Sequence, residues 1–371
     1  MAAFTDFLLS CFPSDESDAL KPILTRFNLE FSAGAAPSVE RPFKLSSLDI
    51  ELLIDLARKY QSEKLLIALA GMCTIELNQD KSIKDPFHPL IGCKDPSIEA
   101  IIIAKAIEIH ALKTIDIDTK SRIVYGLSGN PPTLNHLRFI RHLLGFGEVT
   151  VVLNAQSPLK SLDSYVEPST RLEMLQSMID TLEDSYRARC HLSRLEIDRP
   201  PPSRMAVTMS ILTLLSQENE QFTLVLGLDA LPSFTRWYQW EALGKLCNLK
   251  FYSRPGEIMS DADAESNLKL LDAGGVHNTH LVFNTEAECV AFLERYPSRQ
   301  ASFGVITDIT EGSATQVRTY YKTHDLDTPP PPELNVHPSV HAIIRHYGLF
   351  RPEATESTDE VVTRESKEFK H

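Results

Sequence analysis

The chain has 371 residues, of which 43% are hydrophobic and 23% charged, a balance typical of a globular protein rather than a disordered or fibrous one. Its formal net charge is -13 and it has no block of lysine and arginine, which excludes the basic surface that nucleic-acid binding needs, so we expect no nucleic-acid partner. The length suits two domains.

The spacing of the cysteines and the lengths of the apolar runs indicate the cellular compartment. The six cysteines lie far apart without a CxxC pair, which predicts neither a zinc site nor a disulfide framework and favours a reducing cytoplasm. The first twenty residues lack the basic start of a signal peptide, and no apolar run approaches the roughly 20 residues that span a bilayer. We therefore expect a cytoplasmic protein with no membrane partner, and a homo-oligomer stays open.

The first third of the chain has helical spacing. Apolar residues recur at three and four positions in residues 48–60, 63–72 and 97–112, which is the pattern of helices packed on other helices. We predict a small α-helical domain over residues 1–118, whose role the sequence leaves open.

After Lys120 the pattern changes to alternating strands and helices. The expected strands are RIVYGL, EVTVVLN, FTLVLGL, LKFYSR and THLVFN. Near-continuous Val, Leu and Ile runs that alternate with helices predict a mostly parallel sheet covered on both faces. The expected fold class is α/β, a Rossmann-like, mostly parallel sheet with helices on both faces, preceded by the small α-helical domain. This second domain spans residues 119–352, and the charged segment 353–371 is expected to be disordered.

The first strand runs into the turn and helix GLSGNPPTLNHLRFIRHLL, residues 126–144. In open parallel sheets this first strand-to-helix turn is the usual position of a phosphate. Gly126 and Gly129 permit close backbone approach, and Thr133 can cap the helix. His136 lies in the first helical turn, where free N–H groups and the helix dipole favour anions. A lone histidine there is more often an ordinary polar residue. The surrounding motif therefore decides whether His136 is expected to bind phosphate.

The stretch LSGNPPTLNHLR resembles the first signature of the nucleotidylyltransferases, G-[ST]-F-[DN]-P-x-[HT]-x-G-H, as found in nicotinate and nicotinamide mononucleotide adenylyltransferases. The matching residues are Ser128, Asn130, Pro131, Thr133 and His136. The residues that depart from the signature are Leu127, Gly129 and Asn135, which replace Gly, Phe and Gly.

A second stretch, from Leu224 to Gly256, is similar to the family's strand ending in LGxD, its tryptophan-bearing helix, the next strand and an Arg-Pro-Gly. Gly227 and Asp229 match the LGxD positions near the nucleotide, although an aspartate just past a strand is often a helix cap. Trp237 matches the family's tryptophan that stacks on the pyridine ring, whereas Trp240 is expected in the core.

A third stretch, ITEGSATQVRTYY, resembles the family's ISSTxxR signature through Ser313, Thr315 and Arg318. Hydroxyl and N–H groups at a helix start suit polyphosphate, and an arginine one turn on adds a forked cation. Alone, these residues would indicate a helix cap and a solvated arginine, but their order after the other two stretches favours the phosphate role. The resemblance covers about residues 122–351.

The resemblance implies that the phosphate of nicotinate or nicotinamide mononucleotide attacks the α-phosphorus of ATP and releases pyrophosphate. Such an enzyme works by positioning and charge stabilisation and needs no nucleophile of its own. Mg²⁺ would be bound mainly through ATP, with no metal site made of protein side chains. The implied residues are His136, Thr133 and Arg318 for catalysis; Ser128, Asn130, Gly227, Asp229, Ser313 and Thr315 for ATP; and Trp237, Lys160, Ser203, Arg204 and Thr208 for the mononucleotide.

The other residues assigned to mononucleotide binding, outside the tryptophan segment, match the family pattern only in part. Lys160 follows the second strand, where the family often carries a basic residue, and a solvated lysine is an equal alternative. Ser203 and Thr208 match the S-Y-T-x-x-T segment of acid-preferring bacterial members, in which Arg204 and Met205 replace Tyr and Thr. If Arg204 faces the pocket, a bond to the carboxylate of roughly 1.5–3 kcal/mol would favour nicotinate by about ten- to a hundredfold. If it faces solvent, that preference disappears.

Two other functions stay open. One is a nucleotide-binding or regulatory module with the same fold and little turnover, which the three departures from the first signature favour, while Thr133, His136, Ser313 and Arg318 favour an enzyme. The other is the same reaction on another phosphorylated substrate, such as phosphopantetheine. Trp237 argues against it, because a flat pyridine ring explains a stacking surface better than a flexible chain does.

Overall fold

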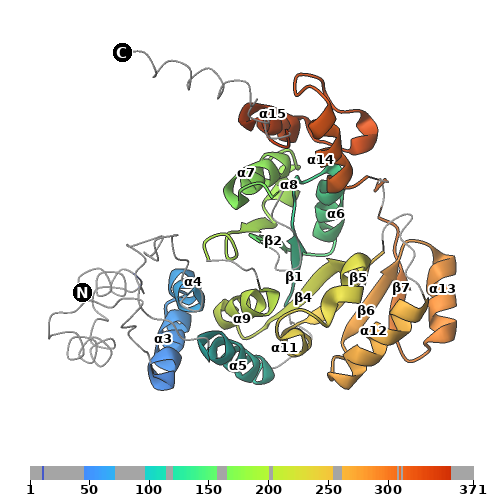
Figure 1. The fold of residues 1–371 in the computed structure, drawn as a ribbon. Coiled ribbons are helices and arrows are strands. Elements are labelled where there is room, and N and C mark those ends of the chain that lie inside the picture. Colours follow the sequence, from blue (N-terminus) through green and yellow to red (C-terminus); the bar gives the residue numbers. More distant parts are fainter. Residues whose placement is uncertain are drawn as a thin grey trace, which may run out of the picture.

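The computed structural model describes residue 11 and residues 46–71, 97–113, 120–156, 165–199, 204–253, 261–306, 309–310 and 312–351. Figure 1 shows a central parallel sheet with helices on both faces, which confirms the predicted fold class. The strand order is β3-β2-β1-β4-β5-β6-β7, and every neighbouring pair is parallel. The strands are β1 (Lys120–Leu127), β2 (Val149–Leu153), β3 (Cys190–Ser193), β4 (Glu220–Gly227), β5 (Asn248–Tyr252), β6 (Thr279–Phe283) and β7 (Gln300–Phe303).

The helices of the described residues are α3 (Ser47–Lys59), α4 (Glu63–Gly71), α5 (Ser97–Ala111), α6 (Leu134–Leu144), α7 (Pro168–Ile179), α8 (Asp184–Arg187), α9 (Met205–Leu215), α10 (Leu231–Phe234), α11 (Trp240–Leu246), α12 (Asp261–Ala273), α13 (Glu286–Arg295), α14 (Ala314–Thr323) and α15 (Pro338–Tyr347). Two short 3-10 helices are η2 (Leu228–Ala230) and η3 (Pro332–Leu334). Across these residues, we find no helix with the length and apolar character that a membrane crossing requires.

The sheet separates two hydrophobic clusters because side chains alternate between the faces of a strand. In β1, Val124 belongs to one cluster, whereas Ile123 and Tyr125 belong to the other. The first cluster contains side chains of α9 to α13, and the second contains side chains of α6, α7, α14 and α15. Both faces of the sheet are therefore buried, as the near-continuous apolar strands predict.

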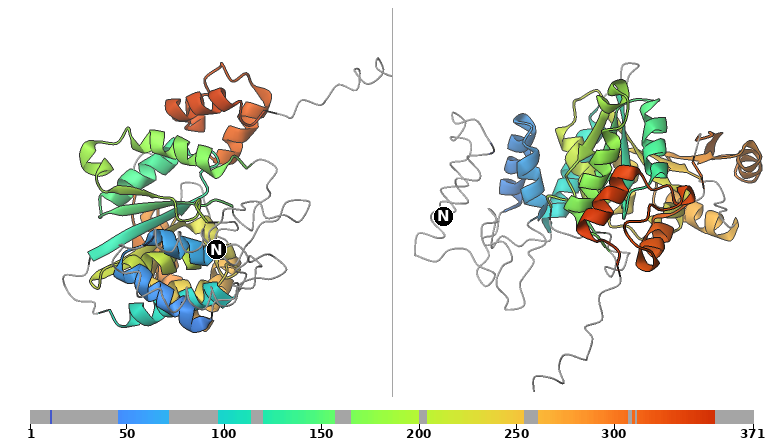
Figure 2. Two further views of the ribbon diagram at one scale, coloured as in Figure 1. Left: turned by 90° about the vertical axis from the view of Figure 1, so that its left-hand side faces the viewer. Right: turned by 90° about the horizontal axis from the view of Figure 1, so that it is seen from above.

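The three described helices before β1 extend the first cluster instead of forming a core of their own. Helices α3, α4 and α5 pack on one another and on α9, and α5 also packs on α11 (Figure 2). As a result α9 is covered on both sides, and the run from Ala206 to Ile211 is buried at every position. Helix α5 ends at Ala111 and β1 begins at Lys120, while the predicted boundary at residue 118 lies outside the described residues and stays a prediction. However, the packing gives no separate core to the helical segment.

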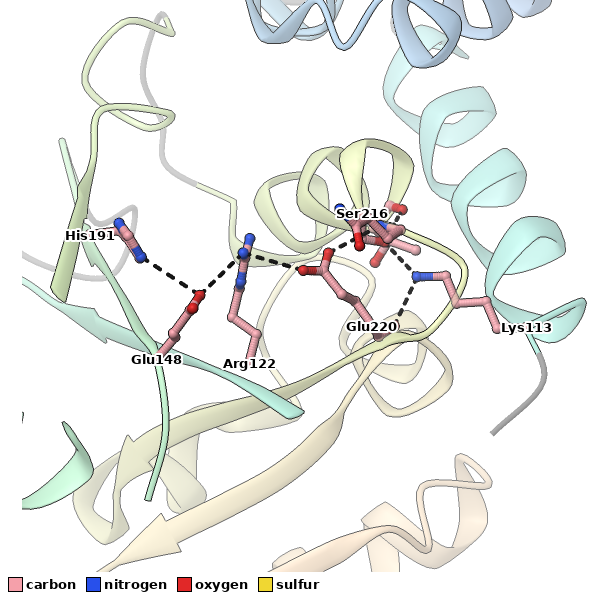
Figure 3. A network of polar contacts seen from close by, with 8 residues as sticks. Lys113, Arg122, Glu148, His191, Ser216 and Glu220 are labelled. Carbon is pink, nitrogen blue, oxygen red and sulfur yellow. Dashed lines mark hydrogen bonds and ion pairs between the residues drawn. The ribbon is translucent and has the colours of Figure 1, made fainter. Parts of the chain in front are cut away.

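A network of polar contacts ties α5 to the amino ends of the strands (Figure 3). Just past α5, the Lys113 ammonium donates to the Ser216 hydroxyl at 2.5 Å and to the Glu220 carbonyl at 2.9 Å. The Glu220 carboxylate lies 3.2 Å from Arg122, which also reaches Glu148 at 3.4 Å. Burial lowers the pKa of Lys113. This network lies at the edge of the sheet opposite the loops that follow β1 and β4.

The strand order reverses direction between β1 and β4, since β1 leads to β2 on one side and β4 leads to β5 on the other. Ligands of open parallel sheets bind at such a point, outside the carboxyl ends of the strands. Here that end of the sheet is bordered by the loop 128–133 after β1 and by residues 228–239 after β4.

Candidate active site

The loop between β1 and α6 is closely packed against its neighbours. Gly129 has a φ of +52°, and a Cβ there would lie 3.1 Å from the Leu153 side chain at the end of β2. Asn130 is buried, and its amide oxygen accepts a hydrogen bond from the Val166 N–H at 3.2 Å. Asn130 therefore shapes the loop through its side chain, and its part in ATP binding stays a prediction.

Thr133 and His136 form a reciprocal cap at the start of α6. His136 Nδ1 accepts the Thr133 backbone N–H at 3.0 Å and lies 2.9 Å from the Thr133 hydroxyl. Because a backbone N–H can only donate, Nδ1 must accept, and the neutral ring then carries its proton on Nε2. Thr133 is 1% exposed, so its hydroxyl positions His136, while a direct part of Thr133 in catalysis stays a prediction.

Helix α14 brings the third motif to the same loop. The Arg318 guanidinium donates to the Asn130 carbonyl at 2.7 Å and to the Thr315 hydroxyl at 3.0 Å. Burial lowers the pKa of Arg318, which nevertheless stays protonated at neutral pH. The Ser313 hydroxyl accepts the Gln316 N–H at 3.3 Å, while the Gln316 side chain accepts the Ser313 N–H at 2.8 Å. Ser313 is thus a helix cap, the plainer of its two predicted roles.

Asn135, which replaces a glycine of the family signature, fastens α6 to the segment before α14. Its side chain donates to the Thr310 carbonyl at 2.8 Å and accepts from the Arg138 guanidinium at 3.1 Å. Arg138 also donates to Asn335, whose amide in turn donates to the Thr310 hydroxyl. The departure from the signature therefore has a structural role that the motif does not reveal.

Arg171 on α7 joins the two loops that follow β1 and β2, and none of the three motifs includes it. The guanidinium is fully buried and donates to the carbonyls of Ser128 at 2.5 Å, Asn154 at 2.8 Å and Ala155 at 2.6 Å. It also donates to the Val166 carbonyl at 2.8 Å. Burial lowers its pKa. A single cation thus fixes the backbone of the loop after β1 and of the loop after β2.

A sequence signal for Arg171 does exist. The residue occupies an apolar position of an amphipathic helix, three and four residues before Met174 and Leu175, which are both buried. The guanidinium of an arginine in that position must either reach solvent or be buried with hydrogen-bond acceptors. The face of α7 on which Arg171 lies is therefore the feature that could have identified it.

Two polar atoms near Arg171 add to the site. Within the described parts of the chain, Asn154 Oδ1 and the Tyr165 hydroxyl are buried and have no hydrogen-bond partner. The Tyr165 ring centroid lies 4.7 Å from the Arg171 guanidinium. Buried polar groups are normally satisfied, so both atoms are candidates for contact with a bound molecule or water.

The other border of the site is formed by the residues after β4. Gly227 ends the strand, and Asp229 is exposed on η2 at the carboxyl edge of the sheet. Trp237 is half-buried, with its ring centroid 5.3 Å from that of the buried Phe234. Trp240 packs on Phe234 and against Gly274, in agreement with its expected place in the core.

The start of α9 differs from the expectation. The Thr208 hydroxyl is fully buried and donates to the buried Glu196 carboxylate at 2.8 Å, so it has a structural partner, and its part in mononucleotide binding stays a prediction. The Arg204 guanidinium contacts Glu99 of α5 and lies 4.4 Å from the Tyr238 ring centroid, and its side chain is 27% exposed, so the carboxylate that it contacts here belongs to the protein. Lys160 and Ser203 lie outside the described residues.

Five predicted residues gather at the carboxyl end of β1: Asn130, Thr133, His136, Thr315 and Arg318. In the described segments, no group of three His, Cys, Asp or Glu side chains could hold a metal ion. The arrangement offers a neutral imidazole donor, a forked cation and backbone N–H groups, which together suit a polyphosphate.

Known proteins resemble the chain in the region that contains this site. The family model for cytidylyltransferase-like proteins matches residues 125–305. A Shewanella pealeana protein named "Probable nicotinate-nucleotide adenylyltransferase" is 26% identical over 242 residues, which cover 64% of this chain and 98% of the relative. A Bacillus mycoides protein of the same name is 32% identical over 136 residues, which cover 36% of this chain and 69% of the relative.

Among solved structures, the Plasmodium falciparum nicotinic acid mononucleotide adenylyltransferase complexed with NaAD is similar at 18% sequence identity and a TM-score of 0.44. The match covers 62% of this chain and 97% of that chain.

Proposed function

The chain belongs to the nicotinate-nucleotide adenylyltransferase family of cytidylyltransferase-like proteins, and we propose that it transfers the adenylyl group of ATP to a pyridine mononucleotide. The observation that carries this proposal is the contact between Arg318 and the Asn130 carbonyl, which joins two motifs 188 residues apart. It brings the start of α14 to the loop that His136 borders. The phosphate-binding predictions of these two motifs thereby concern one place in the fold.

In the proposed reaction, a phosphate oxygen of the mononucleotide attacks the α-phosphorus of ATP. The new P–O bond forms as the bond from the α-phosphorus to the bridging oxygen breaks, and pyrophosphate leaves. His136 donates from Nε2 to an oxygen of the transferring group, and its hydrogen bond to Thr133 keeps the ring in that tautomer. Arg318 and Thr315 hold the leaving pyrophosphate. The protein thus supplies position and charge rather than a nucleophile.

The proposal includes Mg²⁺ as a companion of ATP. The cation would be held by phosphate oxygens and water, which suits an ion that dehydrates reluctantly. Ser128, Asn130, Gly227 and Asp229 border the space in which we propose that ATP binds.

We propose that the pyridine ring lies on the β4 side of the site, against Trp237. The ring of Trp237 is half-buried on Phe234, which fixes its orientation and leaves part of it accessible. The names of the relatives favour nicotinate mononucleotide over the amide. A cytoplasmic location also stays our proposal, since the enzyme would draw on the soluble nucleotide pool.

One assay tests the function. Purified protein is incubated with ATP, Mg²⁺ and either nicotinate or nicotinamide mononucleotide, and the product is identified by its mass. We expect a dinucleotide and pyrophosphate in equal amounts. A reaction without mononucleotide and one with phosphopantetheine as acceptor are the controls. ATP binding without any dinucleotide would contradict the proposal in favour of a binding module.

A further inference from the structure

A carboxylate of the N-terminal helices contacts the start of α9. The Glu99 side chain on α5 is only 5% exposed, and it forms an ion pair with the guanidinium of Arg204. Arg204 is the N-cap residue of α9 and is 27% exposed, so it keeps one open side. A buried carboxylate needs such a partner, because an unpaired charge there would be costly.

The Arg204 guanidinium lies close to the segment against which we propose that the pyridine ring binds. It is 4.4 Å from the ring centroid of Tyr238, the residue next to Trp237. The following residue, Met205, reaches β1, since a Cβ on Gly126 would lie 2.8 Å from its methyl group. Arg204 therefore lies beside the segment that follows β4, and its neighbour Met205 lies beside the last residues of β1.

Helix α5 holds Glu99 firmly in this position. Near its start α5 is bound to α9 through Glu99 and Arg204, and just past its end through Lys113 and Ser216 (Figure 3). Between these two points α5 packs along α9 and buries Ile102, Ile103 and Ala106. The two helices run in the same direction, so this packing keeps the backbone at Glu99 beside the start of α9.

We propose that Glu99 is a specificity-determining residue, which offsets the charge of Arg204 and thereby suppresses selection of the acid mononucleotide over the amide. The inference rests on the proposed function. A nicotinate carboxylate that approached Arg204 would meet a cation already paired with a buried anion. The attraction to Arg204 would be largely offset by repulsion from Glu99, whereas the neutral amide would be affected little.

The test is the ratio of kcat/KM for nicotinate mononucleotide to kcat/KM for nicotinamide mononucleotide. Glu99→Gln removes the negative charge and keeps the shape, so the ratio should rise by about tenfold or more. Glu108→Gln is the matched control, because Glu108 is exposed on the same helix and pairs with Lys105. A merely structural role of Glu99 would change both kcat/KM values alike and leave the ratio unchanged, which would overturn the inference.

A second variant keeps the test decisive if Glu99→Gln folds poorly. Arg204→Met leaves the Glu99 charge uncompensated, so the ratio should fall below the native value. In the double variant Glu99→Gln/Arg204→Met both charges are gone, and the ratio should return close to the native value. An unchanged ratio in Arg204→Met would overturn this inference but would leave the proposed function intact. Absence of turnover with both mononucleotides in the native protein would instead overturn the proposed function.

Discussion

At the scale of single residues, the pairing of His136 with Thr133 has the clearest consequence. The Thr133 N–H fixes Nδ1 as an acceptor, so Nε2 is presented as a donor without protonation of the ring. We expect His136→Ala to lower kcat by on the order of 10²-fold, because one preorganised donor to the transferring phosphate is lost. Circular dichroism and steady-state kinetics check this, with His346→Ala on the exposed side of α15 as the control. Retained turnover in a folded His136→Ala protein would contradict the mechanism.

Single residues also show where sequence reasoning ends. His136 and Arg318 could be predicted because each stands in a stretch that resembles a family signature, and both lie near a helix start. Thr208 and Arg204 could not be interpreted in the same way, since their partners, Glu196 and Glu99, are set by tertiary packing. A motif specifies the type of a side chain at a position, but its orientation depends on neighbours that are remote in the sequence.

At the scale of elements, α7 fixes the two loops that follow β1 and β2 through Arg171. We expect Arg171→Met to lower the free energy of unfolding by about 3 kcal/mol, because several buried carbonyls lose their donor. Displacement of the loops should also lower kcat/KM by on the order of 10²-fold. Arg171→Lys should restore the free energy of unfolding and kcat/KM only in part. The ammonium keeps the charge but has fewer donors than the guanidinium and lacks its forked geometry.

Urea denaturation and steady-state kinetics measure these effects. Arg187→Lys on α8 is a suitable control, because that guanidinium is exposed and pairs with Asp184. If Arg171→Met unfolds at the same urea concentration as the native protein, the buried contacts do not hold the loops.

The elements themselves were predictable to different degrees. The five strands with dense Val, Leu, Ile and Phe were identified, whereas β3 and β7 were not. Both missed strands lie at the edges of the sheet and have four residues each, CHLS and QASF, without a β-branched residue. The sequence of α9 also carries a signal of its surroundings: MAVTMSILTLL is apolar on all sides, which indicates a helix covered on both faces.

At the scale of the whole molecule, the covered α9 predicts how the chain responds to truncation. From the sequence, residues 122–351 form a complete strand and helix pattern that could fold alone. The structure changes this expectation, because removal of α3, α4 and α5 would expose the outer side of α9 and leave Ser216 and the Glu220 carbonyl without Lys113. We expect the fragment 122–351 to melt without cooperativity or to aggregate, since an exposed apolar patch of this kind favours association.

Differential scanning calorimetry and the binding of a hydrophobic dye measure the response of the fragment. The chain shortened only by residues 352–371 is the control and should melt as the full chain does, because it keeps α3, α4, α5 and α11, the helices that pack on α9. A cooperative melt of the fragment 122–351 at the native temperature, without dye binding, would show that the sheet domain is stable without the three N-terminal helices. In that case the contacts of α5 with α9 would serve to position Glu99 rather than to complete the core.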